Sequence, residues 1–152
     1  MAKKANSASS TRSSKSKPER HEDLVAAAWR VRDKAVAPYS GFKVGAALLA
    51  ADGKVFTGCN IENSTYGLTV CAERVAVFKA LSEGANSFTK IAIVTASPKL
   101  TPPCGSCRQI LWEFCGDIEI LMANQQGQHR RTHLSKLFPE PFERSFFRSN
   151  DE

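Results

Sequence analysis

Hydrophobic residues near the start of the chain recur first with a helical period and then in strand-like runs. From His21, apolar side chains fall three or four positions apart until Pro38 interrupts the pattern, so we predict a first helix here. Two apolar runs follow, VGAALLA and KVFTGCNI, and Asp52 and Gly53 lie between them. An Asp-Gly pair between such runs is typical of a tight hairpin turn. This part of the chain therefore predicts a helix followed by two antiparallel strands.

The rest of the pattern alternates helices with strands. A segment that opens at Cys71 has a helical period and stops at Gly84, and the apolar run at 91–96 suits a strand that is covered on both faces. A turn around Pro103 leads into a third helix. Further elements are a strand at 118–122, a turn at 124–127 into a last short strand, and a helical turn at 134–137. The order predicts an α/β fold, a three-layer α/β/α sandwich with a mixed sheet of about five strands.

The two ends of the chain differ from this patterned region. Residues 1–18 are mainly Ser, Lys, Ala and Asn without a large apolar side chain, so we expect a disordered basic tail. A single domain is expected at 19–145, because a chain of 152 residues that is 42% hydrophobic suits one core. Residues 146–152 are expected to be a flexible C-terminus.

The formal charge of +6 is concentrated in the tail, where residues 1–20 hold six bases and one acid. The folded part is therefore nearly neutral, which disfavours a nucleic-acid partner, because such proteins carry basic residues along a face of the fold. No apolar run approaches the roughly 20 residues that cross a membrane, and no apolar signal segment begins the chain. We therefore expect a cytoplasmic protein without a membrane partner.

Cysteines mark the candidate chemistry. Cys71 opens one predicted helix, and Cys104 and Cys107 open another in the sequence PCGSC. Three thiolates from two helix starts suit one Zn²⁺ per chain, with the fourth tetrahedral position left to water as in a catalytic site. Cys59 leaves open a structural site with four cysteines, although a cysteine on a strand also packs as a small buried hydrophobe. A bare CxxC pair is also typical of structural zinc sites and redox dithiols.

Charged residues follow these cysteines directly. Glu73 lies in the first turn of its predicted helix, from which a carboxylate can reach water on the metal without binding the metal itself. It could then move protons as a general acid and base. Arg74 and Arg108 could donate hydrogen bonds to the thiolates, and the positive ends of the helix dipoles would further offset their charge.

Three segments together, GCNIENSTYG, CAER and PCGSCRQ, resemble the small homotetrameric class of zinc-dependent cytidine deaminases. The resemblance covers about residues 22–142. It implies that Cys71, Cys104 and Cys107 bind zinc, and that a zinc-bound hydroxide attacks C4 of cytidine or deoxycytidine while Glu73 shuttles the proton. The expected products are ammonia and uridine or deoxyuridine, in pyrimidine salvage. Ser64, Ser106 and the Pro-Pro pair before Cys104 depart from residues that are common in the family.

The same resemblance implies a nucleoside pocket. Asn60 and Glu62 would hold the ribose hydroxyls, and Phe42 and Ala72 would line the substrate site. A carboxylate would repel a phosphate, and the chain has no phosphate-binding loop, so a nucleoside is favoured over a nucleotide. Family members form homotetramers whose neighbours complete each site, and the residues expected in such cross-subunit or supporting positions are Tyr66, Arg74 and Phe142.

Three other functions remain open at this stage. A blasticidin-S-type deaminase would share the architecture, and an RNA or DNA cytosine deaminase could use the basic tail as a tether. A zinc-stabilised module without catalysis would need no carboxylate at position 73. The NIEN segment favours the nucleoside enzyme, because it resembles a ribose-binding segment.

Overall fold

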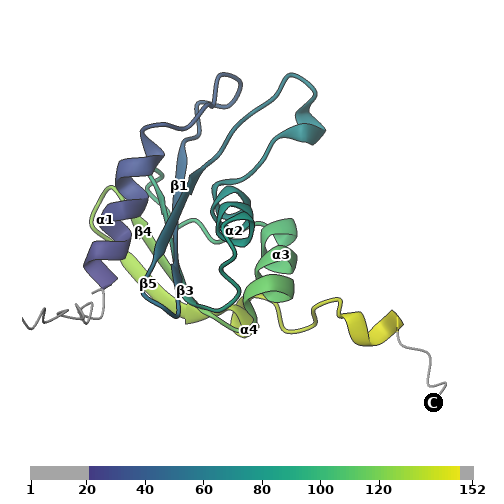
Figure 1. Ribbon diagram of the computed structural model, residues 1–152. Coiled ribbons are helices and arrows are strands. Elements are labelled where there is room, and N and C mark those ends of the chain that lie inside the picture. The colour runs from purple at the N-terminus through teal and green to yellow at the C-terminus, as the bar shows by residue number, and fades with distance from the viewer. Residues whose placement is uncertain (1–20, 148–152) are drawn as a thin grey trace, which may run out of the picture.

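The computed structural model of the chain describes residues 21–147, and the predicted tail at 1–18 lies outside these residues. The helices and strands follow the predicted order (Figure 1). They are α1 (His21–Arg32), β1 (Val44–Ala50), β2 (Val55–Cys59), the 3₁₀ helix η1 (Tyr66–Leu68), α2 (Ala72–Ser82), β3 (Phe88–Thr95), α3 (Gly105–Cys115), β4 (Glu119–Asn124), β5 (His129–His133), α4 (Leu134–Leu137) and the 3₁₀ helix η2 (Arg144–Phe147).

The five strands form one mixed sheet in the order β2-β1-β3-β4-β5. Strand β1 pairs with β2 and β3 in antiparallel fashion, and β4 pairs with β5 in the same way. Only β3 and β4 are parallel, and α3 connects them. A parallel pair needs such a crossover, whereas the β1–β2 pair needs only the predicted Asp-Gly turn.

Helices cover both faces of the sheet, with α1 on one side and α2 and α3 on the other (Figure 1). Successive side chains of a strand point to opposite faces of the sheet, so alternate residues of the central strands pack against the two helical layers. In β1, Ala46 and Leu48 pack with α2, whereas Ala47 and Leu49 pack with α1. Strands β3 and β4 alternate in the same way, so the predicted three-layer sandwich with a mixed five-stranded sheet is confirmed.

Close approach of α2 to the sheet depends on Gly58 of β2. A Cβ atom at this position would lie 2.3 Å from the backbone oxygen of Ala72 and 2.5 Å from the backbone nitrogen of Ala76. No other residue type fits at this distance without a shift of the backbone. Gly58 therefore lets the first turn of α2 lie directly on β2, which fixes the height of that helix start above the sheet.

Some element boundaries differ from the sequence prediction. The first helix ends at Arg32, short of the predicted stop at Pro38, and residues after it pair with the 60–62 segment instead, through the bridge between Val36 and Ile61. Strand β3 begins three residues early at Phe88. The predicted flexible C-terminus begins within η2, and residues 148–152 lie outside the described part of the chain.

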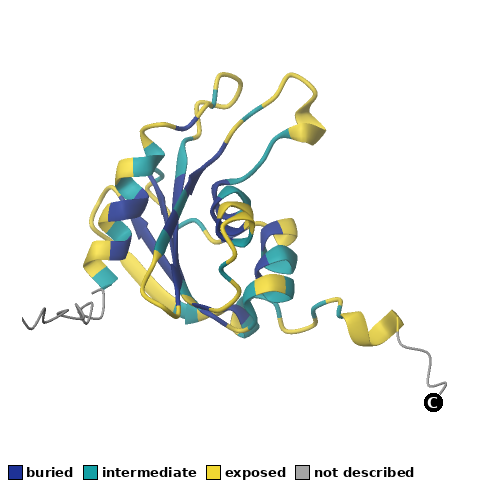
Figure 2. Cartoon of the chain, in the orientation of Figure 1, coloured by how far each residue is buried: buried dark blue, intermediate teal, exposed yellow. Residues whose placement is uncertain are grey.

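Burial is concentrated in the sheet and in the inward sides of the helices (Figure 2). The loops that follow α1 and β2 are largely exposed, and so is the segment that follows α4. Among residues 21–147, no helix has the length and hydropathy needed to cross a bilayer.

Candidate metal centre and active site

Three cysteine sulfurs meet where two helices begin. Cys71 is the N-cap residue of α2, Cys104 is the N-cap residue of α3, and Cys107 lies in the first turn of α3. The sulfurs of Cys71 and Cys104 are 4.0 Å apart, and all three sulfurs lie within 4.8 Å of one another. In the described part of the chain these cysteines form the only group of three or more potential metal ligands.

The donor set fits Zn²⁺. Tetrahedral coordination with Zn–S bonds of about 2.3 Å places sulfurs roughly 3.8 Å apart, which is close to the Cys71–Cys104 separation. Cys104 is exposed and Cys71 is half-buried, so the cluster has an open side. Cys59 is buried on β2 and does not belong to the group, so the alternative of a four-cysteine site finds no support among residues 21–147.

Hydrogen bonds and a nearby guanidinium favour the thiolate of Cys71. A hydrogen bond from the Cys107 thiol, together with the charge and hydrogen bond of Arg74, lowers the pKa of Cys71 to about 5 despite burial. The same interaction with Cys71, together with burial, raises the pKa of Cys107. Nη2 of Arg74 lies 3.5 Å from the Cys71 sulfur and 3.2 Å from the backbone oxygen of Thr69. Since metal ligands must be deprotonated, zinc binding at this site would release protons.

Glu73 is a buried carboxyl group beside the sulfurs. It is the second residue of α2, its exposed fraction is 5%, and it interacts with the Cys107 thiol. Burial raises the pKa of Glu73 to about 7, and the negative charge of Cys71 adds to this effect. A carboxyl group that exchanges its proton near neutral pH suits general acid and base catalysis.

Arg108 does not reach the sulfurs, contrary to the expectation that both arginines would support the ligands. Its guanidinium donates to the backbone oxygens of Pro103 at 2.8 Å and of Leu137 at 2.6 Å. It therefore joins the loop before α3 to the end of α4. Of the two arginines, only Arg74 hydrogen-bonds a candidate ligand.

Asn60 and Phe42 are brought together by the structure. Asn60 is buried at the end of β2, where its Oδ1 accepts the N–H of Val44 at 2.8 Å and its Nδ2 donates to the backbone oxygen of Phe42 at 2.8 Å. The Phe42 side chain is exposed. Asn60 thus fixes the backbone on both sides of position 43 and keeps one donor and one acceptor site for other partners.

Glu62, two positions after Asn60, binds the same loop. Its Oε2 accepts the N–H groups of Tyr39 at 2.8 Å and Ser40 at 3.2 Å, and its Oε1 accepts the Ser40 hydroxyl. The Ser40 hydrogen bond is the main reason that the pKa of Glu62 is lowered. The sequence pattern does not predict the part played by Ser40. The only signal is its position between two aromatic residues, in the order Tyr39-Ser40-Gly41-Phe42.

The remaining candidate residues, Ala72, Tyr66 and Phe142, lie in three different parts of the chain and differ in burial. Ala72 is fully buried as the first residue of α2. Tyr66 of η1 is 72% exposed and meets Tyr39 edge to face, with ring centroids 5.6 Å apart. Phe142 is 54% exposed in the segment after α4, where its backbone exchanges two hydrogen bonds with the Gln109 side chain of α3. Neither Tyr66 nor Phe142 is buried within this chain.

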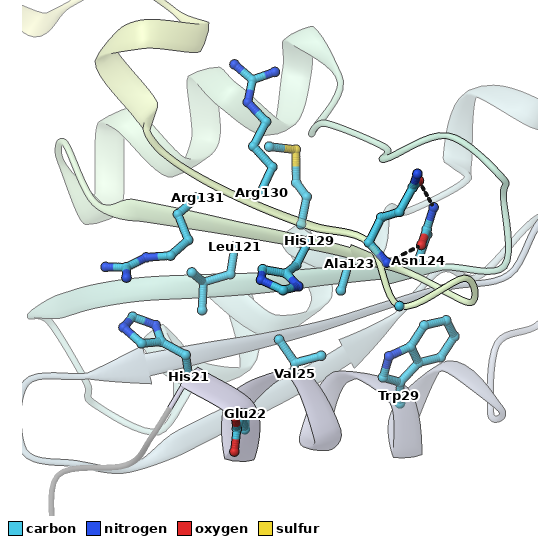
Figure 3. A pocket seen from close by; sticks show the side chains of 13 residues that line it. His21, Glu22, Val25, Trp29, Leu121, Ala123, Asn124, His129, Arg130 and Arg131 are labelled. Carbon is cyan, nitrogen blue, oxygen red and sulfur yellow. Dashed lines mark hydrogen bonds between the residues drawn. The ribbon is translucent and has the colours of Figure 1, made fainter.

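A separate cavity of about 370 Å³ lies on the α1 side of the sheet. His21, Val25 and Trp29 point from α1 toward Leu121 of β4 and His129 of β5 (Figure 3). This cavity does not include any of the three clustered cysteines, which belong to the starts of α2 and α3. It is therefore distinct from the candidate metal centre.

Comparisons with known proteins agree on one family. The family model for the cytidine and deoxycytidylate deaminase zinc-binding region matches residues 18–123. A cytidine deaminase of Sporosarcina psychrophila is 48% identical over 80% of this chain and 90% of its own length. A probable cytidine deaminase of Dictyostelium discoideum is 44% identical over 80% of this chain and 82% of its own length. The crystal structure of cytidine deaminase from Burkholderia pseudomallei covers 82% of this chain and 100% of its own, with a TM-score of 0.79 and 47% identity.

Proposed function

The chain belongs to the cytidine and deoxycytidylate deaminase family, and we propose that it catalyses the hydrolysis of the 4-amino group of cytidine and deoxycytidine. The products are uridine or deoxyuridine and ammonia, a reaction of pyrimidine salvage. The observation that carries this proposal is the meeting of three cysteine sulfurs with the buried carboxyl group of Glu73 at two helix starts.

Cys71, Cys104 and Cys107 would hold one Zn²⁺ per chain. When bound, zinc supplies a Lewis acid that makes water nucleophilic at neutral pH. The chain's own contribution is to offset the charge of three thiolates. Arg74 donates to the Cys71 sulfur, and the N-termini of α2 and α3 direct positive dipole ends at the ligands. A zinc centre with thiolate ligands also suits the reducing cytoplasm, where we place the enzyme.

Glu73 carries the proton transfers. We assign it the role of accepting a proton from the attacking water and passing it to the ring nitrogen next to C4. Glu73 would then take the second proton from the hydroxyl group now on C4 and deliver it to the amino group as ammonia leaves. Burial favours this role, because the pKa of about 7 lets the group act as base and acid within one cycle. Its place next to Cys107 keeps it beside the ligands.

The sugar would lie over the loop that follows α1. Phe42 offers an exposed ring, and Asn60 keeps one donor and one acceptor site after its two backbone bonds. The negative charge of Glu62 favours a neutral nucleoside over a nucleotide. Ala72, beside Glu73, would form the wall nearest the base.

We further propose that the chain acts as a homotetramer. Tyr66 and Phe142 are large apolar residues that remain more than half exposed in one chain, and such exposure is typical of an interaction surface. A neighbouring subunit that covers them would close the nucleoside site from outside. The Gln109 side chain exchanges two hydrogen bonds with the backbone of Phe142 and so fixes its position. Gln109 belongs to α3, the helix with two of the cysteines at its start.

A substrate comparison with Glu73→Gln tests the proposal. The purified protein is assayed with cytidine, blasticidin S and a cytosine-containing RNA, and turnover of cytidine is followed by its near-UV absorbance. We expect cytidine to be the best substrate, and Glu73→Gln to retain zinc while losing roughly 10²–10⁴-fold in kcat. Turnover of the antibiotic alone, turnover of RNA alone, or an unimpaired Glu73→Gln would each reject the proposal.

A further inference from the structure

Ser40 joins the Glu62 side chain to the backbone of Phe42, two residues that we place around the nucleoside. Its hydroxyl donates a hydrogen bond to Oε1 of Glu62, while the same hydroxyl oxygen accepts the N–H of Phe42 at 2.9 Å. Its own backbone N–H donates to Oε2 of Glu62 at 3.2 Å. One small residue thus connects the Glu62 carboxylate to the loop that presents the Phe42 ring.

We propose that Ser40 is a positioning residue that fixes the Glu62 carboxylate so that it accepts one sugar hydroxyl, an inference that rests on the proposed function. The proposal follows from how the hydrogen bonds are divided between the two carboxylate oxygens. Both backbone donors, from Tyr39 and Ser40, reach Oε2. Two bonds to a single oxygen leave the carboxylate free to rotate about that oxygen. The Ser40 hydroxyl is the donor that holds Oε1 and so sets the plane of the group.

The count of acceptor sites supports the specificity of this arrangement. An ionised carboxylate offers about four lone-pair sites, and three are occupied by Tyr39 and Ser40. The remaining site lies on Oε1, beside the Ser40 hydroxyl. Glu62 can therefore accept one further hydroxyl group in a direction that Ser40 determines.

Serine suits this place because its hydroxyl must donate and accept at once. The Ser40 hydroxyl donates to the Glu62 carboxylate and accepts the N–H of Phe42. An alanine would lose both hydrogen bonds, and a threonine would retain both. The next residue, Gly41, has a φ of +67° and no neighbouring atom within 4 Å of where a Cβ would stand. A left-handed φ favours glycine, so Gly41 forms the turn, while the Ser40 hydroxyl bonds the Glu62 carboxylate and the N–H of Phe42.

Steady-state kinetics on the full-length zinc-loaded protein test the role. Ser40→Ala removes a hydrogen bond to a charged group, so we expect the KM for cytidine to rise roughly tenfold while kcat and zinc content stay near wild-type values. Ser40→Thr keeps a hydroxyl group, so its KM for cytidine should stay near the wild-type value. Ser82→Ala is the matched control, because the Ser82 hydroxyl bonds the backbone oxygen of Lys79 at the far end of α2. A fall in kcat at unchanged KM would overturn the proposal.

A double-mutant cycle separates an effect through Glu62 from an effect through Phe42. If Ser40 acts by orienting the carboxylate, Ser40→Ala should add little to the KM in a Glu62→Gln background. An undiminished rise in that background would show that Ser40 acts through the Phe42 loop alone, and would reject the proposal.

A titration without substrate distinguishes failure of this inference from failure of the proposed function. The Ser40 hydroxyl is the main cause of the lowered pKa of Glu62, so an NMR titration of Ser40→Ala should show that pKa moving up toward its ordinary value. An unchanged pKa would overturn the proposal whatever the enzyme's activity. A wild-type protein that does not deaminate cytidine would reject the proposed function, while the titration would still decide whether Ser40 positions Glu62.

Discussion

Individual residues around the sulfurs decide how strongly the site can bind a metal. Three thiolates around one Zn²⁺ carry excess negative charge, which must be offset by donors nearby. Arg74 is placed to do this, since its guanidinium reaches the Cys71 sulfur. The same guanidinium nitrogen also donates to the backbone oxygen of Thr69, so Arg74 links Cys71 to the loop before α2.

Replacing Arg74 with glutamine should therefore weaken zinc binding roughly 10–100-fold, as expected for loss of a residue that supports a ligand. Competition with a chromogenic chelator measures this affinity. Arg108→Gln is the matched control, because Arg108 bonds two backbone oxygens and no sulfur, so its loss should affect stability more than zinc affinity. Equal losses of zinc affinity in both variants would contradict the distinction.

The sequence predicts the candidate ligands but not this distinction between the arginines. The ligands follow from residue type and spacing, and the structure brings together the same three cysteines. Arg74 lies three positions after Cys71 and Arg108 lies four positions after Cys104, so helical spacing alone favours both arginines equally. The difference arises because the Arg108 guanidinium bonds the backbone oxygens of Pro103 and Leu137 instead. Ser40 could not be predicted, because its role depends on a loop contact with Glu62, 22 residues away in the chain.

Among the secondary-structure elements, the fit between α2 and β2 controls the position of the helix start that holds Cys71 and Glu73. Gly58 makes this fit possible, because a Cβ at this position would clash with the backbone atoms of Ala72 and Ala76, which cannot rotate away. A larger residue must therefore lift the start of α2.

Gly58→Ala should lower the free energy of unfolding by roughly 2–3 kcal/mol and weaken zinc binding at the same time. Urea denaturation and zinc titration measure the two effects. Gly67→Ala is the control, since a Cβ at position 67 meets no atom within 4 Å. A Gly58→Ala protein with normal stability and zinc affinity would show that α2 is placed by other contacts.

Glu119 joins several elements on the α1 side of the sheet. It bonds Arg131 across the β4–β5 pair, with an Nε–Oε1 distance of 2.7 Å, and lies 3.7 Å from both Lys90 and His21. Burial alone would raise the pKa of Glu119, but the hydrogen bond and charge of Arg131, together with His21 and Lys90, lower it on balance.

This lowered pKa predicts a pH dependence of stability. A carboxylate whose pKa is lower in the folded state stabilises the protein above its unfolded pKa of about 4.3, and the contribution disappears as pH falls through the folded pKa. The stability advantage of wild type over Glu119→Gln should therefore be present at pH 6 and shrink at pH 3. An advantage that grows on acidification would contradict the sign of the shift.

Helices and strands could be predicted where their apolar residues recur with a helical or strand period. Their ends and the short 3₁₀ helices could not. Alternate residues of β1 pack into the two hydrophobic clusters on opposite faces of the sheet. The continuous apolar run VGAALLA is typical of such a strand, in which both faces are covered. The apolar residues around Val36 predict a longer first helix, whereas α1 ends at Arg32 and Val36 bridges Ile61. The 3₁₀ helix η1 has no side-chain cap to signal it.

At the scale of the whole molecule, exposed aromatic side chains gather on one segment and offer a surface for the homotetramer that we propose. Phe142 stacks on Phe146 with ring centroids 5.4 Å apart, and Phe147 meets Phe142 edge to face. These rings lie on the segment that extends past α3 and α4 (Figure 1). Sequence periodicity does not predict this cluster, and only the family resemblance singles out Phe142.

We expect light scattering after gel filtration to give about four times the chain mass of 16.6 kDa. Phe142→Ser should shift the protein toward smaller species and reduce turnover in parallel, because serine lacks the ring that we place in the neighbour's site. The control is Phe114→Ser, on the opposite end of α3 from the cysteines, which should alter turnover less. A fully active monomer would contradict the assembly.

The most direct test of the whole account is turnover of cytidine as a function of bound zinc. Metal is removed from the purified protein with a chelator and returned in steps, and each sample is analysed for zinc per chain and for the near-UV absorbance change of cytidine. We predict that turnover rises in proportion to zinc and reaches its plateau at one ion per chain. Full turnover without zinc, or none at one zinc per chain, would contradict the account.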